Sequence, residues 1–152
     1  SLGGMQLVSV TDFEKVQRGL GFSYRYRDPA DPFNLDVYIY NEGQNISDGT
    51  DAAIISQQVD AALADVRTVA AQGVYQNVTI TDTTQTYRFG DVKFRCVTLR
   101  FEVKGQPVQS LLLLRGERGS FVKVRATWSS DDIKAAASVQ NWVAAFAALL
   151  KR

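Results

Sequence analysis

Three long runs of strand-forming residues follow one another between Lys93 and Trp128, and they constrain the fold more than any other feature. Valine, leucine, phenylalanine and threonine, which favour extended backbone, are frequent in all three. The turns between the runs, KGQP at 104–107 and GERG at 116–119, both contain glycine. This pattern predicts an antiparallel β-meander.

The apolar pattern of the meander predicts cover on both of its faces. Val92, Phe94 and Cys96 share one face of the first run, whereas Val97 and its alternate neighbours share the other. Either both faces are covered or a bulge shifts the register. The unbroken leucine run 111–114 favours the first account, because a central strand covered on both faces can be apolar throughout.

Two segments with helical periodicity can supply this cover. The first spans Ala52–Gln72, with Thr50 or Asp51 as the N-cap and Gly73 as a left-handed C-cap. The second follows the capping stretch 129–132 and ends near the cations at 151–152, which suit the negative end of the helix. The predicted buried stripes are Ile55, Val59, Leu63, Val66 and Ala70, then Ile133, Ala136, Val139, Trp142 or Val143, Phe146 and Leu149.

The remaining elements complete one domain over residues 1–152, in which we expect 1–5 to be disordered or not native. We predict an α+β fold with a mainly antiparallel central sheet of about six to seven strands between helices, an α/β/α sandwich. A weak helix start at 11–14 predicts irregular structure or one helical turn ahead of Gly19. A proline-containing loop at 28–32 separates the strands of a hairpin. The other expected strands are Gln6–Val10, Phe22–Arg27, Leu35–Tyr40, Val74–Thr81 and Thr84–Phe89.

The composition excludes several functional classes. The chain has no histidine and one cysteine, so a histidine triad, a cysteine-rich metal site and an internal disulfide are excluded. Its 17 basic and 16 acidic residues give a formal charge of +1, which argues against a nucleic-acid partner. Its uninterrupted apolar runs are shorter than the roughly 20 residues of a transmembrane helix. We therefore predict a chain without a transmembrane segment, metal, cofactor or enzymatic activity.

The order of elements and two motifs resemble the Mog1/PsbP-like fold. The motifs are GFSYRYRDPADPFNLDVYIYNEG at 21–43 and LLLLRGERGSFVKVRATW at 111–128. Within that fold, the order of elements and the motifs are similar to those of small bacterial extracytoplasmic proteins, often lipoproteins. The resemblance implies a non-enzymatic accessory module with a protein partner, periplasmic or extracellular, with an upstream lipid anchor. The alternative is a cytoplasmic adaptor or chaperone for a secreted effector, and a third hypothesis is a carboxylate- or cysteine-based hydrolase. The resemblance carries over no functional residue.

Three candidate reaction or metal sites each have a simpler structural explanation. Cys96 shares its face with Val92 and Phe94, as a core residue would, and no histidine is present to activate it. The pair Asp131-Asp132 is explained by capping of the last helix. The loop 41–51 carries Asn and Asp side chains but lacks the alternating ligands and the terminal Glu of a calcium loop.

Basic residues at alternating strand positions predict a partner-binding surface. The basic residues at these positions are Arg25, Arg27, Arg95, Lys123 and Arg125. If the strands are neighbours, these side chains form a positive surface edged by tyrosines and suited to an anionic partner. The alternative is neutralisation by Asp36 and Glu102 through cross-strand pairing. The predicted surface consists of Arg25, Arg27, Tyr38, Tyr40, Lys123 and Arg125.

Overall fold

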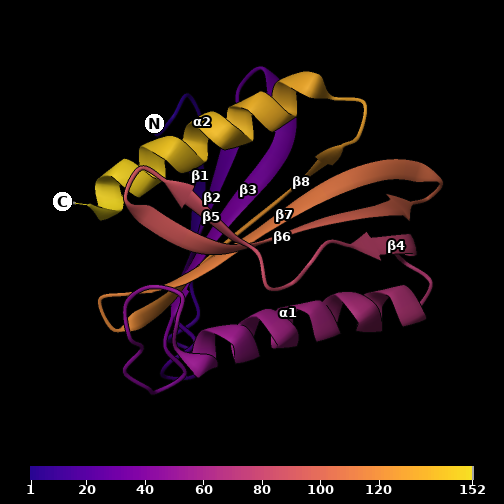
Figure 1. The fold of residues 1–152 in the computed structure, drawn as a ribbon. Helices are drawn as coiled ribbons and strands as arrows, with labels where there is room; N and C mark the ends of the chain where they lie inside the picture. The colour runs from indigo at the N-terminus through magenta and orange to yellow at the C-terminus, as the bar shows by residue number, and fades with distance from the viewer. Residues whose placement is uncertain (152) are drawn as a thin grey trace.

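A computed structural model describes residues 1–151 and shows one eight-stranded sheet with a helix on each side (Figure 1). All strand pairs are antiparallel. The helices are α1 (Ala53–Ala71) and α2 (Ile133–Leu150). The strands are β1 (Gln6–Asp12), β2 (Phe22–Asp28), β3 (Asp31–Tyr40), β4 (Gln76–Ile80), β5 (Thr86–Phe89), β6 (Val92–Val103), β7 (Gln106–Glu117) and β8 (Ser120–Ser129).

The strand order β1-β2-β3-β8-β7-β6-β4 places the long meander in the centre of the sheet. Both β4 and β5 pair with the outer edge of β6, at opposite ends of that strand. The α+β class and the mainly antiparallel sheet are therefore confirmed. The sheet has eight strands instead of the expected six to seven, because two short strands share one long edge.

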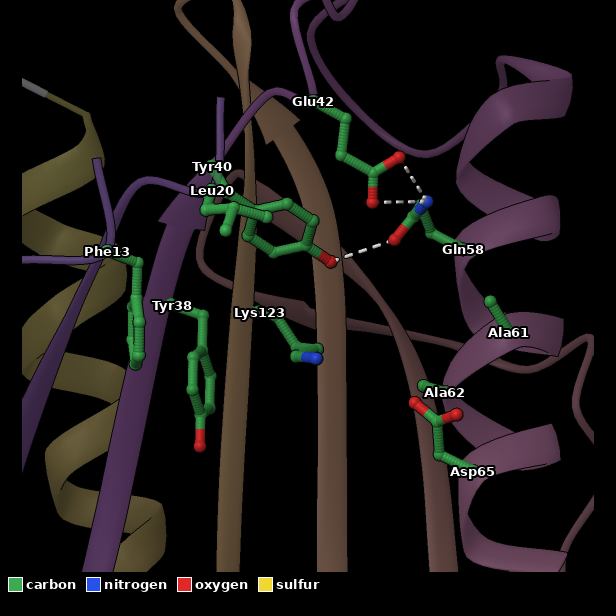
Figure 2. Close-up of a pocket in the computed structure, with 10 residues that line it drawn as sticks. All are labelled: Phe13, Leu20, Tyr38, Tyr40, Glu42, Gln58, Ala61, Ala62, Asp65 and Lys123. Carbon is green, nitrogen blue, oxygen red and sulfur yellow. Dashed lines mark hydrogen bonds between the residues drawn. The ribbon is translucent and has the colours of Figure 1, made fainter. Parts of the chain in front are cut away.

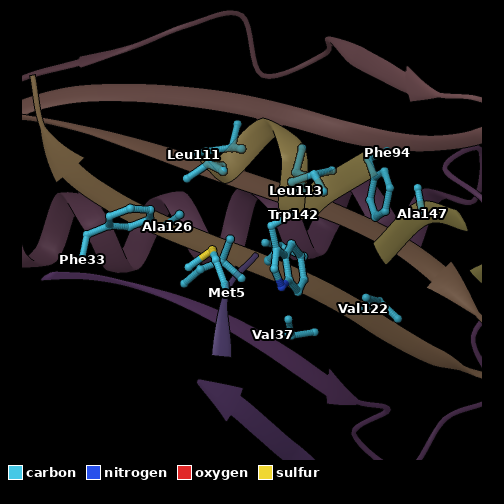
Figure 3. Close-up of a cluster of buried hydrophobic side chains, with 14 of the residues drawn as sticks. Met5, Phe33, Val37, Phe94, Leu111, Leu113, Val122, Ala126, Trp142 and Ala147 are labelled. Carbon is cyan, nitrogen blue, oxygen red and sulfur yellow. The ribbon is translucent and has the colours of Figure 1, made fainter. Parts of the chain in front are cut away.

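Two apolar cores lie on opposite faces of the meander. Leu111 and Leu113 belong to the core beneath α2, whereas Leu112 and Leu114 belong to the core beneath α1. The pairing of β6 with β7 has no register shift. Cover on both faces, and not a bulge, therefore explains the continuous apolar run. Figure 3 shows the α2 core, in which the Trp142 ring is fully buried.

The face that α1 covers is only partly enclosed. The buried side chains of α1 pack on β6, β7 and the beginning of β8, where Phe121 lies. Farther along β8, and on β2 and β3, the same face carries polar side chains. We call this region the open sheet face and define it by its principal residues, which cross-strand pairing places in neighbouring rows. They are Arg25, Arg27, Asp36, Tyr38, Lys123 and Arg125.

The buried side of α2 differs from the predicted stripe. Ile133 is 86% exposed and Leu149 is 43% exposed. At 3.6 residues per turn, Ile133 and Val139 lie on different sides of the helix, and the fully buried Trp142 decides which side faces the sheet. The buried residues of α2 are Ala135, Val139, Trp142, Val143 and Ala147.

The predicted N-cap of α1 is also wrong. Ala52 occupies that position and makes no side-chain capping hydrogen bond. The preceding loop is held elsewhere, because Ile46 and Gly49 form β-bridges to Gly119 and Gly116 beside the β7–β8 turn. Gly73, at a φ of +81°, follows the helix with the predicted left-handed backbone.

The N-terminal region is more regular than expected. Residues 1–5 form a turn in which Met5 is fully buried in the α2 core and pairs with Leu2. β1 continues to Asp12 where a helix start was expected, and β3 begins at Asp31, inside the expected loop. At the other end Lys151 forms an ion pair with Asp91, whereas Arg152 lies outside the described residues.

Within residues 1–151, α2 alone is long and apolar enough to cross a membrane by length and composition. Core helices of soluble proteins pass the same test. The buried side chains of α2, which make up 28% of the helix, pack against the sheet in one core cluster.

Candidate functional site

A cavity of about 320 Å³ lies between α1 and the open sheet face (Figure 2). Tyr38 and Lys123 form its floor. One wall comes from α1, including Ala61 and Asp65, and the opposite wall is Phe13 with Leu20 from the loop between β1 and β2. We call this cavity the α1 groove. A second hollow of about 410 Å³ lies over Arg25, Asp36 and Arg125, and we call it the arginine hollow.

Lys123 occupies the floor of the α1 groove between two aromatic rings. Its Nζ lies 4.8 Å from the ring centroid of Tyr38 and 5.6 Å from that of Tyr40. These distances allow cation–π attraction. Burial, reinforced by the nearby positive charge of Arg125, lowers the pKa of Lys123. Among the described residues, no carboxylate forms an ion pair with Lys123.

Hydrogen bonds set the width of the α1 groove. The hydroxyl of Tyr40 donates to Oε1 of Gln58 on α1 at 2.9 Å, and Nε2 of Gln58 donates to Oε1 of Glu42 at 3.3 Å. Burial raises the pKa of Tyr40, so its hydroxyl stays protonated at neutral pH and remains a donor. This chain ties the sheet to α1 and to the loop after β3.

The Phe13–Leu20 wall is held by one carboxylate. Oε2 of Glu14 accepts hydrogen bonds from the backbone N–H of Gly19 at 2.6 Å and of Gly21 at 3.0 Å. The N–H of Phe13 also donates to the carbonyl oxygen of Gly21 at 2.9 Å. The loop is therefore closed upon itself beside the groove.

Arg125 is oriented by a buried hydroxyl and keeps most of its donors available. Its Nε donates to Oγ of Ser110 at 2.9 Å, and that hydroxyl donates to the carbonyl oxygen of Ala126 at 3.1 Å. Ser110 is only 1% exposed, so this anchor is rigidly placed. The terminal nitrogens of Arg125 make no hydrogen bond or ion pair with residues 1–151. They are free to bind an oxygen anion in a bidentate manner.

The other two arginines of the open sheet face already have partners. Nε and Nη2 of Arg25 donate to the two carboxylate oxygens of Asp36 at 2.8 and 3.0 Å. Nε of Arg27 donates to Oδ1 of Asn34 at 3.1 Å. The neutralisation considered from the sequence therefore holds for Arg25. Glu102 plays no part in it, since its Oε2 accepts a hydrogen bond from Asn77 at 2.8 Å.

The structure brings all six predicted surface residues to one side of β2, β3 and β8. That they bind a partner stays a prediction. Arg95, from the same basic set, is separate: it is buried beside α1, where Nη1 donates to Oγ of Ser56 at 2.7 Å and Nη2 donates to the carbonyl oxygen of Thr83. It therefore connects α1 to the β4–β5 loop and is not available at the open sheet face.

Sequence reasoning missed the walls of the α1 groove. Phe13 and Glu14 come from a stretch that was expected to be irregular or to form one helical turn, and Leu20 follows that stretch. Gln58 and Asp65 lie outside the predicted buried stripe of α1. The available signal was the two glycines at 19 and 21, which suggest an irregular loop. Nothing in the sequence indicated that this loop and α1 face one another.

Cys96 has the environment of a core residue. It is half-buried and packs against the α2 core together with Phe94. Burial raises the pKa of its thiol, which disfavours the nucleophilic thiolate.

Asp131-Asp132 was assigned to capping of the last helix, and the structure shows which of the two carboxylates acts. Oδ1 of Asp132 accepts from the N–H of Ala135 at 3.0 Å, so the capping role is confirmed. The carboxylate that meets Asp132 is Asp31, from the start of β3. A shared hydrogen bond with Asp132 raises the pKa of Asp31 to about 6, and the same bond lowers the pKa of Asp132. Within the described residues, no group of three or more carboxylate or cysteine side chains is arranged to hold a metal ion.

Asp31→Asn is expected to stabilise the protein selectively above about pH 6. The folded state keeps a proton on Asp31 up to about pH 6, whereas an unfolded Asp loses it near pH 4, so stability falls as pH rises through this window. An asparagine amide still donates to Asp132 but does not titrate. Thermal unfolding at about pH 4 and about pH 8 should show the variant gaining Tm over wild type only at the higher pH. The control variant Asp131→Asn should show no such dependence on pH. An equal gain in Tm by Asp31→Asn at both pH values would contradict the shared proton.

A scan against models of protein families and a search of curated proteins gave no match to this chain. The interpretation of the site therefore depends on its geometry.

Proposed function

We propose that this chain is a non-enzymatic protein-binding module that receives an acidic segment of its partner on the open sheet face. One observation carries the proposal: Lys123 and Arg125 are neighbours on one face of β8, and neither forms an ion pair with a carboxylate of residues 1–151. Two adjacent like charges raise each other's electrostatic energy, and an anion bound to either of them relieves the repulsion. Among the residues that define the open sheet face, four are basic and one, Asp36, is acidic, while Glu42 and Asp65 on the walls of the α1 groove attract Lys123.

We further propose a Mog1/PsbP-like fold and an extracytoplasmic location, with a lipid anchor upstream. A central antiparallel sheet between two helices supports the fold assignment. The location follows from the resemblance of the two sequence motifs. Fractionation of cells that express the full gene product tests it, because recovery in the envelope fraction is expected and recovery in the cytosol would favour the adaptor alternative.

Charge reversal at Arg125 is the direct test of partner binding. The tagged full-length protein should retain one partner from native cells, and Arg125→Glu should reduce that retention by about tenfold or more, since a lost charged contact weakens binding by at least 1.4 kcal/mol. Arg67→Glu, which reverses an exposed arginine on α1, is the matched control. Quantitative mass spectrometry, followed by titration of the purified partner at two salt concentrations, gives the readout. Full retention by Arg125→Glu would refute the proposal.

The adaptor alternative is favoured by one specific feature. Leu7 and Val10 of the edge strand β1, together with Phe22 of β2, are 47%, 53% and 37% exposed. Register places them on the α2 side of the sheet, away from the basic residues. A dimer in light scattering that dissociates on Val10→Lys would favour the adaptor with an apolar contact at this edge.

A further inference from the structure

The α1 groove and the arginine hollow are consecutive sites along the same two strands. Tyr38 pairs with Lys123 at the groove, and two positions along the strands Asp36 pairs with Arg125 at the hollow. Each residue of an extended strand advances by about 3.3 Å, so two positions separate the sites by about 7 Å. Alternate side chains of an extended peptide have the same separation.

The two sites differ in chemistry. The groove is walled by Phe13, Leu20 and small alanines of α1 (Figure 2). At its base Lys123 lies between the rings of Tyr38 and Tyr40, where its ammonium can contact an aromatic ring of the ligand as well. Such walls suit an apolar or aromatic side chain. The hollow presents the free terminal nitrogens of Arg125 beside an Arg25 that Asp36 already satisfies. One guanidinium with two open donors suits one carboxylate.

Charge favours one arrangement of these groups over its reverse. Glu42 lies at the end of the groove beyond Tyr40, away from the arginine hollow. In the reverse arrangement the carboxylate of the ligand would lie at that end, where the negative charge of Glu42 would repel it. The acidic residue therefore belongs on the Arg125 side of the apolar one.

We infer that the segment bound at this face is an extended peptide in which one residue separates an apolar side chain, seated in the α1 groove, from an Asp or Glu that binds Arg125. The inference rests on the proposed function and specifies its ligand. Both β3 and β8 are paired on both edges, so the peptide is held by side chains and not by strand addition. Recognition then depends on the spacing of the two side chains.

Selection from a display library of random linear peptides at low salt tests this spacing. The wild-type protein should enrich peptides with an aromatic or large aliphatic residue two positions from Asp or Glu. Arg125→Gln should abolish the acidic preference and keep the apolar one. Ala61→Trp, which fills the groove from an exposed position of α1, should do the opposite. Enrichment of peptides without this spacing by the wild-type protein would overturn the inference. So would enrichment of peptides with this spacing by both Arg125→Gln and Ala61→Trp.

Titration of one selected peptide by fluorescence anisotropy provides the quantitative test. Changing its Glu to Gln should weaken binding to the wild-type protein by about tenfold. The same peptide change should have little effect on binding to Arg125→Gln, because the carboxylate has already lost its partner. Equal losses on both proteins would overturn the inference. A native partner that is lost on Arg125→Glu while no spaced peptide is selected would reject the peptide motif and leave the proposed function intact.

Discussion

Replacing Trp142 with alanine is expected to lower the free energy of unfolding by about 3–5 kcal/mol. The side chain is fully buried at the centre of the α2 core. Its ring lies 4.8 Å from that of Phe146 and 5.3 Å from that of Tyr26, measured between centroids. Gly3 also packs closely on the backbone of Trp142, where an added Cβ would lie 2.6 Å from its Cα. Urea denaturation followed by circular dichroism measures the loss.

Two further variants separate packing from other effects. Trp142→Phe keeps a ring and removes Nε1, which is buried without a hydrogen-bond partner among the described residues, so its loss should be the smaller one. Leu149→Ala changes a partly exposed residue of the same helix and should have a small effect. A Trp142→Ala protein that unfolds at the wild-type urea midpoint would contradict the packing of α2.

Gly21→Ala is expected to destabilise the protein by about 3 kcal/mol and to open the wall of the α1 groove. Gly21 has a φ of +71°, which is unfavourable for residues with a Cβ. A Cβ at this position would also lie 1.8 Å from the carbonyl oxygen of Ile39. The entry to β2 must therefore move away from β3, and the hydrogen bond from Gly21 to Glu14 is disturbed with it.

Gly43→Ala isolates the contribution of backbone conformation. Its φ of +76° is nearly the same, but no atom lies within 4 Å of an added Cβ. The free energy of unfolding of this variant should fall only by the cost of holding an alanine in left-handed backbone conformation, about 1–2 kcal/mol. Thermal and urea unfolding of the two variants under one set of conditions gives the comparison. Equal losses would show that the contact with Ile39 relaxes without disturbing the hairpin.

The Gly21 variant also connects fold and binding. Phe13 and Leu20 keep their places because Glu14 holds the amides of Gly19 and Gly21. If the loop moves, the apolar part of the proposed peptide site is lost while Arg125 remains in position. The selected peptide should then bind Gly21→Ala weakly, but should still bind better with Glu than with Gln.

Much of the fold followed from local pattern. The turns around the leucine run and the aromatic alternation of 22–27 located β2 and the meander because strand periodicity does not depend on distant contacts. The rotation of α2 could not be predicted in this way. Its apolar residues surround most of the helix, so several stripes were compatible with the sequence, and the fit of Trp142 into the sheet selected one.

The candidate site was predicted in part. Alternation along β2, β3 and β8 predicted that six basic and tyrosine side chains share a face within each strand. It did not predict which strands are neighbours. β3 pairs with β8 across about eighty to ninety intervening positions, a contact with no local signal. Only that pairing brings Tyr38 beside Lys123 and Asp36 beside Arg125. Tertiary geometry also decides that Asp36 forms its ion pair with Arg25 and not with Arg125, so that the terminal nitrogens of Arg125 stay free of protein partners among the described residues.

The sequence by itself determined the strands, the two helices, the need to cover both faces of the meander and the absence of histidine chemistry. These depend on short-range periodicity and composition, which each segment carries alone. Only the tertiary structure decided that α1 leaves part of one sheet face open, and that a loop and a helix distant in sequence enclose a cavity beside it. A cavity exists only where separate elements meet, so its shape and its charges are properties of the packed chain.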